Sequence, residues 1–150
     1  MIDSITINAV AGFLAALFAI LSFFSARQIQ KNTDRRNDFI AVHQYMKALE
    51  QRSFIDARAH VYKLAESGQP LTKEDKNASL IVNFYHHWGL LAQKGYLPMW
   101  VFEEAGHGMV RMYEMTETYI ETLRKLHHDN TYGCYFEWLY KQIVRKNPSI

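Results

Sequence analysis

The distribution of apolar and polar residues divides the chain into an uncharged N-terminal stretch and a longer amphipathic part. Residues 5–26 form a run of 22 positions without a charged side chain, and most of them are apolar. A helix of about 22 residues rises roughly 33 Å, whereas the hydrocarbon core of a bilayer is about 30 Å thick. A cleaved signal peptide would need an early positive charge, but only Asp3 precedes the run. The pattern therefore predicts an uncleaved transmembrane anchor over residues 1–26.

The segment after the anchor has the pattern of an amphipathic helix. It contains neither Gly nor Pro between Arg27 and Leu49. Phe39, Val42, Met46 and Leu49 recur at steps of 3, 4 and 3 residues, which places them on one helical face. We therefore expect a basic juxtamembrane helix over residues 27–50.

Residues 51–150 repeat the helical period between Gly- and Pro-containing breaks. Ser53 with Asp56 predicts the start of one helix, and Thr72 predicts the N-cap of the next, whose aromatic face we expect at the centre of the core. Pro98 predicts the first turn of a helix that includes Trp100, Val101 and Phe102, and further helices are predicted near residues 109–127 and 132–146. The predicted fold class is all-α, with an N-terminal transmembrane helix followed by a small bundle of about five helices. The predicted domains are 1–26, 27–50 and 51–150.

Charge gives the predicted anchor an orientation. The basic residues just after it form a positive flank: Arg27, Lys31, Arg35 and Arg36. Positive flanks stay on the cytoplasmic side, so we expect the N-terminus outside and the soluble domain in the cytoplasm. The same cations favour anionic headgroups by about 1 kcal/mol each, which makes the lipid bilayer an expected partner. The balance of 17 basic and 15 acidic residues argues against a nucleic-acid partner.

Small residues within the predicted span suggest self-association. Gly12 with Ala16, and Ala15 with Ala19, are small residues four positions apart, a spacing that lets two helices approach closely. A homo-oligomer through the span is therefore one hypothesis. The other is that these residues reflect only an alanine-rich composition.

No motif in the sequence predicts a reaction. Cys134 is the only cysteine, and its aromatic surroundings favour a small apolar role. The seven histidines show no HExxH motif, and a cross-helix metal site such as His86 with His127 is an unfavoured alternative. Glu114, Glu117 and Glu121 are best explained as an exposed helix face. We expect no enzymatic activity, no metal and no cofactor.

Two arginines are candidates for structural ion pairs. Arg58 and Arg124 each lie next to predicted core positions, and Glu137 in the C-terminal aromatic run is a plausible partner. The alternative is that both arginines extend to solvent along apolar surfaces.

The chain resembles a bacterial family of small membrane-anchored proteins, domain-of-unknown-function family 4760. The resemblance is carried by the Ala57-Arg58 step, by Trp88-Gly89-Leu90-Leu91 with Lys94-Gly95, and by Tyr119-Ile120, Arg124 and the run Tyr135–Tyr140. Family members often have a Trp where this chain has Tyr113 and Met115. The resemblance implies a bacterial membrane protein and no particular reaction. With the predicted orientation, it places the protein in the bacterial inner membrane.

The predicted function is a single-pass membrane-anchored interaction module that binds a protein partner whose identity the sequence does not give. Two alternatives stay open: an oligomeric membrane effector of the toxin or anti-phage type, and a metal-dependent hydrolase.

Overall fold

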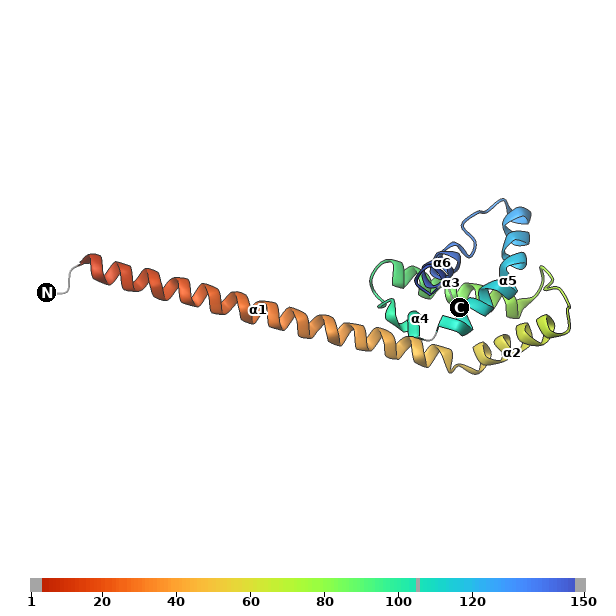
Figure 1. The fold of residues 1–150 in the computed structure, drawn as a ribbon, viewed down its shortest axis with the longest axis horizontal. Helices are drawn as coiled ribbons and strands as arrows, with labels where there is room; N and C mark the ends of the chain where they lie inside the picture. Colours follow the sequence, from red (N-terminus) through yellow and green to blue (C-terminus); the bar gives the residue numbers. More distant parts are fainter. Residues whose placement is uncertain (1–3, 105, 148–150) are drawn as a thin grey trace. The chain divides into compact units, whose positions relative to one another are not determined.

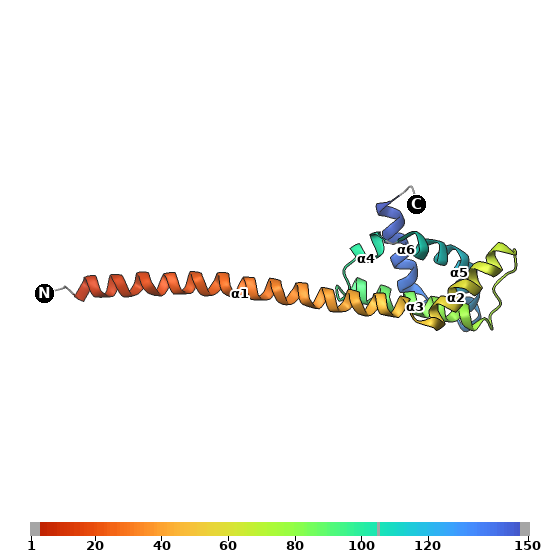
Figure 2. The ribbon, with the colours of Figure 1, turned by 90° about the horizontal axis from the view of Figure 1, so that it is seen from below.

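The computed structural model describes the backbone of residues 4–104 and 106–147 and the side chains of residues 18–104 and 106–147. All regular structure in these residues is helical, which confirms the all-α part of the predicted fold class. The helices, drawn in Figures 1 and 2, are α1 (Ser4–Leu49), α2 (Arg52–Glu66), α3 (Lys76–Gln93), α4 (Trp100–Glu104), α5 (Gly106–His127) and α6 (Cys134–Lys146).

The chain divides into two units, residues 1–39 and residues 40–150, which we call the N-terminal unit and the C-terminal unit. The division falls inside α1 and differs from the predicted boundaries at 26 and 50. Without Gly or Pro between Arg27 and Leu49, nothing in the sequence interrupts the helix at either position.

The predicted transmembrane helix is wrong. Among the residues that the structure describes, no helix combines the length and the apolar composition needed to cross a membrane. A span needs about 20 predominantly apolar residues. The helix α1 is longer than that, but it carries charged side chains from Arg27 onward.

The C-terminal unit is organised around α3, which packs against α2, α5 and α6 (Figures 1 and 2). The aromatic face predicted for this helix does lie in the core: Phe84 stacks on Phe54, and Tyr85 stacks on Phe136, with ring centroids 3.9 and 4.7 Å apart. Tyr45, at the C-terminal end of α1, is buried against this aromatic cluster, with its ring centroid 5.0 Å from that of Phe102. Each helix thus contributes one apolar face to a single core.

A glycine permits the close approach of α3 and α6. A Cβ atom on Gly89 would lie 2.9 Å from the carbonyl carbon of Tyr135 and closer still to its oxygen. Only a residue without a side chain fits between these backbones. Gly89 therefore fixes the spacing of the helix pair.

The N-cap of α3 differs from the prediction. The side chain of Asp75, and not that of Thr72, accepts hydrogen bonds from the backbone N–H groups of Asn77 (2.9 Å) and Ala78 (3.0 Å). The two residues lie three positions apart in a polar stretch, where propensity does not separate candidate caps. This shift places a carboxylate at the edge of a pocket.

Candidate functional site

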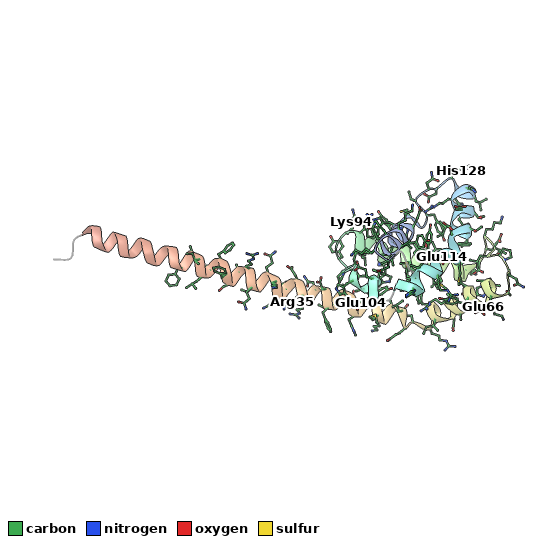
Figure 3. All side chains as sticks on the ribbon, in the orientation of Figure 1. Arg35, Glu66, Lys94, Glu104, Glu114 and His128 are labelled. Carbon is green, nitrogen blue, oxygen red and sulfur yellow. The ribbon has the colours of Figure 1, made fainter. Side chains whose placement is uncertain are left out.

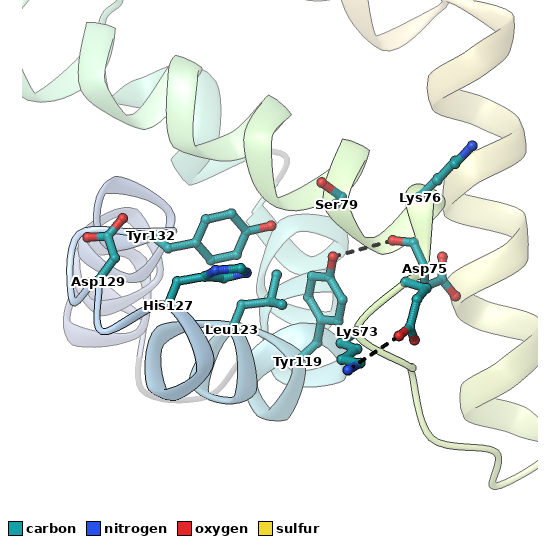
Figure 4. A pocket seen from close by; sticks show the side chains of 10 residues that line it. Lys73, Asp75, Lys76, Ser79, Tyr119, Leu123, His127, Asp129 and Tyr132 are labelled. Atoms are coloured by element: carbon teal, nitrogen blue, oxygen red, sulfur yellow. Dashed lines mark hydrogen bonds and ion pairs between the residues drawn. The ribbon is translucent and has the colours of Figure 1, made fainter.

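A pocket of about 320 Å³ lies between the N-terminal end of α3, the C-terminal half of α5 and the loop that precedes α6 (Figure 4). We call it the Asp75 pocket. Its more enclosed lining consists of Asp75, Ser79, Tyr119, Leu123 and Tyr132. Its exposed lining carries charged or ionisable side chains: Lys73, Glu74, Lys76, His127 and Asp129.

Asp75 is held in place by protein groups on both carboxylate oxygens. Oδ1 caps α3, and Oδ2 lies 2.8 Å from Nε2 of His60 on α2. Burial alone would raise the pKa of Asp75, but the hydrogen bonds from Ala78, His60 and Asn77 outweigh burial and hold the pKa below its ordinary value. The carboxylate is therefore ionised and already engaged, so its role is to order the pocket wall.

Three hydroxyl groups face the same region of the pocket in Figure 4, those of Ser79, Tyr119 and Tyr132. The Tyr119 hydroxyl donates a hydrogen bond to the backbone carbonyl of Asp75 at 3.3 Å. Burial raises the pKa of Tyr119, and the neighbouring Tyr132 acts in the same direction, so this phenol stays protonated at neutral pH. The Tyr132 hydroxyl is buried and has no hydrogen-bond partner in the described part of the chain. A bound molecule could therefore form a hydrogen bond with this hydroxyl.

The charged residues around the pocket are of mixed sign. Lys73 pairs with Glu74 at 3.6 Å, and Asp129 accepts hydrogen bonds from the backbone N–H and the hydroxyl of Thr131. Hydroxyl donors inside and mixed charges outside suit a small polar molecule that makes several hydrogen bonds. In the described residues, no group of three or more His, Cys, Asp or Glu side chains is placed to hold a metal ion.

Comparison with protein families identifies the family of this chain. Residues 6–143 match the family described as Domain of unknown function (DUF4760). The chain belongs to this family. The match confirms the resemblance seen in the sequence and takes in most of both units. No curated protein and no solved structure matches the chain.

In this DUF4760 chain, two of the candidate ion-pair residues, Arg124 and Glu137, lie together next to Tyr132 of the pocket lining. Nη1 of Arg124 donates to Oε2 of Glu137 at 2.8 Å, and Nε of Arg124 donates to the carbonyl of Tyr132, also at 2.8 Å. The hydrogen bond from Lys141 and that from Arg124 keep the pKa of Glu137 below its ordinary value, against the effect of burial. The arginine thus ties α5 to α6 and holds the loop that carries Tyr132.

Arg58 lies elsewhere. It is half-buried on α2, with its guanidinium carbon 5.9 Å from the ring centroid of Phe54, and its Nε atom is buried without a hydrogen-bond partner in the described residues. Glu137 pairs with Arg124 and Lys141, not with Arg58. The structure therefore separates two arginines that the sequence had treated alike.

The predicted membrane-flank residues lie on α1 in the N-terminal unit. All four, Arg27, Lys31, Arg35 and Arg36, are exposed, and Figure 3 shows Arg35 directed away from the helix axis. Of the predicted span-packing residues, Ala19 is exposed, and Gly12, Ala15 and Ala16 lie outside the described side chains.

Sequence reasoning missed the Asp75 pocket. Its lining comes from three segments, residues 73–79, 119–127 and 129–132. The only local signal was Thr72, which predicted the start of a helix in this segment. Nothing in the sequence indicated that two tyrosines more than 40 residues away would face that helix end.

Proposed function

We propose that this DUF4760 protein is a non-enzymatic interaction module, attached to an anionic lipid surface by residues 18–38 of α1 in its N-terminal unit. The observation that carries the proposal is the exposure of large apolar side chains on α1. Phe18 is 71% exposed, Leu21 62% and Phe24 61%. Large exposed apolar surfaces are rare on isolated soluble proteins and mark a binding surface for another apolar phase.

The arrangement of these residues favours lipid over a single partner helix. The large apolar residues stand at 18, 20, 21, 23 and 24. At about 3.6 residues per turn, these positions spread over roughly 220° of the helix circumference. One partner helix covers only a narrow stripe, whereas a helix lying in the surface of a bilayer can bury a broad apolar face. Lipid contact therefore accounts for the full set.

The basic residues that follow support an anionic surface. Between Arg27 and Asp38 there are four basic and two acidic residues, and all of them are exposed. Each Lys or Arg near an anionic leaflet contributes about 1 kcal/mol, which the two acids partly offset. Because anionic lipids are enriched in the cytoplasmic leaflet, the proposal places the C-terminal unit on the cytoplasmic side.

In this proposal the C-terminal unit supplies the binding part. Its hydrogen-bonded Asp75 pocket suits a small polar ligand, and the engagement of both Asp75 oxygens favours binding over proton transfer.

Vesicle flotation of the full-length chain tests the proposal. The wild type is expected to float with vesicles of phosphatidylcholine and phosphatidylserine, and less well with phosphatidylcholine alone. The variant Phe18→Ser/Phe23→Ser/Phe24→Ser is expected to lose most of this binding. Replacing the four basic flank residues with Gln is expected to remove the preference for anionic lipid. The matched control replaces four exposed basic residues of the C-terminal unit with Gln: Lys63, Lys94, Lys125 and Arg145.

Two outcomes would contradict the lipid proposal. One is flotation that does not depend on Phe18, Phe23 and Phe24. The other is a wild type that forms a discrete oligomer without lipid, measured by sedimentation equilibrium, and shows no binding to vesicles. That second result would assign the exposed residues to self-association.

A further inference from the structure

A second pocket lies beside the Asp75 pocket in the C-terminal unit. Its volume is about 180 Å³, and its walls come from α2, from the loop that precedes α3 and from α5. Five of its lining residues carry apolar side chains: Val61, Ala65, Pro70, Leu71 and Met115. We call it the Leu71 pocket. Water leaves an apolar lining when a hydrocarbon group fills it, and this favours binding of such a group.

The two pockets meet at Tyr119, which lines both of them. Residues 69–71 line the Leu71 pocket, and the lining of the Asp75 pocket begins at Lys73 on the same loop. Tyr119 is buried, and its hydroxyl donates to the backbone carbonyl of Asp75 at 3.3 Å (Figure 4). Because one side chain contacts both cavities, a single molecule can reach from one to the other.

The charges of the Asp75 pocket leave no strong counter-charge for an ionic ligand. Each of its three carboxylates, those of Glu74, Asp75 and Asp129, already pairs or hydrogen-bonds with a protein group. Lys73 and Lys76 line the same pocket and nearly balance their charge. A charged ligand group would lose its hydration here without gaining an unpaired partner, so a neutral group is favoured.

The group that the Asp75 pocket leaves unsatisfied is itself neutral. The Tyr132 hydroxyl is buried and has no hydrogen-bond partner among the described residues. The Ser79 hydroxyl, which accepts a hydrogen bond from Asn83 at 3.3 Å, faces the same region (Figure 4). A hydroxyl both donates and accepts, so ligand hydroxyl groups are the matching partners.

We propose that the Asp75 pocket and the Leu71 pocket together bind one neutral amphipathic molecule, with a hydroxyl-bearing head group at Tyr132 and an alkyl chain against Leu71 and Met115. The inference rests on the proposal that the C-terminal unit is the binding part, and it names the class of ligand. Each CH₂ group that the Leu71 pocket buries is expected to raise the affinity by up to about fourfold.

Isothermal titration of the full-length chain in a mild nonionic detergent tests this assignment. The probes are octane-1,2-diol, ethane-1,2-diol, which is the head group without the chain, and octanoate, which has the chain with a charged head group. Octane-1,2-diol is expected to bind about tenfold more tightly than either of the others, because only this probe matches both pockets.

Variants locate the alkyl chain. Ala65 is an exposed residue of the Leu71 pocket, so Ala65→Leu should fold normally and occupy part of the pocket. It is expected to bind octane-1,2-diol about tenfold more weakly and ethane-1,2-diol as the wild type does. Ala59→Leu is the matched control, because Ala59 is also exposed on α2 but lines neither pocket. All variants are compared in the same detergent, which takes up the probe equally.

A second pair of variants locates the head group. Tyr132→Phe removes only the buried hydroxyl and is expected to weaken the binding of both diols about fivefold. Tyr96→Phe, at an exposed tyrosine outside both pockets, is the control and should bind like the wild type.

Three results would overturn the proposal. Equal binding of octane-1,2-diol and ethane-1,2-diol would leave a site for a small polar ligand alone, as would equal losses in Ala65→Leu and Ala59→Leu. No binding of any probe by the wild type would also remove the binding role of the C-terminal unit. Vesicle flotation measures the lipid attachment of α1 separately, so the two failures are distinguishable.

Discussion

Replacing Gly89 with alanine adds one methyl group at a close contact between α3 and α6. The new Cβ would lie 2.9 Å from the carbonyl carbon of Tyr135, and the atoms opposing it are backbone atoms. A flexible side chain could rotate away from the added group, but a helix backbone cannot. Relief therefore requires α6 to move away from α3, which would loosen the contacts that Phe136 and Leu139 make in the core.

Two effects of opposite sign set the magnitude. Alanine is favoured over glycine inside a helix by about 1 kcal/mol. Overpacking a rigid interior typically costs about 1–3 kcal/mol, and a clash with backbone belongs at or above the upper end of that range. The net expectation is a loss of about 2 kcal/mol in the free energy of unfolding. For a unit of roughly 100 residues, this corresponds to a Tm about 10 °C lower.

Near-ultraviolet circular dichroism is the suitable readout, because most of the chain's aromatic residues pack in the C-terminal unit. Thermal melts of the full-length wild type, Gly89→Ala and Gly108→Ala should be compared. Gly108 is also helical, but a Cβ atom there would meet only the Nη2 atom of Arg58 at 3.7 Å, an ordinary contact. Gly108→Ala is therefore expected to be as stable as the wild type or slightly more so. If Gly89→Ala had the same Tm as Gly108→Ala, the steric argument would be refuted.

Two further predictions concern buried charge. Glu137→Gln is expected to lower the free energy of unfolding by about 1–2 kcal/mol in urea titrations, because it removes the charged partner of the mostly buried Arg124 guanidinium; an unchanged midpoint would show that the pair contributes nothing. Folding lowers the pKa of Asp75 from its ordinary value of 3.8 and the pKa of Glu137 from its ordinary value of 4.5. The two carboxylates therefore contribute their full stabilisation above these values, and this stabilisation is lost as the pH falls through their lowered pKa values in the folded state. Below about pH 4.5 the wild type should therefore lose stability, and Asp75→Asn should lose less of it with falling pH than the exposed control Asp56→Asn.

The sequence predicted the helices well where periodicity and breaks agree. The buried residues of α2, α5 and α6 recur mostly at steps of 3 and 4, because a helix must bury its apolar stripe. The stripe predicted for residues 27–50 is only half correct, since Val42 and Leu49 pack against the core but Phe39 is 71% exposed and Met46 49%. Gly95, with φ +77°, and Gly68, with φ +67°, come just after the ends of α3 and α2, where only a residue tolerant of positive φ fits readily. These are local properties that a short stretch of chain specifies.

The transmembrane prediction failed because it rested on the composition of one segment. An uncharged run is a strong signal for a span, but in the described residues no helix combines the length and the apolar composition that crossing a membrane requires. The cap of α3 was misplaced because Thr72 and Asp75 are both good caps by type. In the fold, Asp75 also contacts His60, which lies 15 residues earlier in the chain.

By itself, the sequence determined that the protein is helical and where most of its helices begin and end, because these follow from periodicity and backbone propensity. Tertiary structure alone decided that Asp75 meets Tyr119, that Glu137 pairs with Arg124 and not with Arg58, and that Arg124 also holds the Tyr132 carbonyl. These pairings join residues far apart in the chain. They arise from the angles at which helices pack, and those angles depend on the whole core, including a glycine whose missing side chain lets two backbones meet.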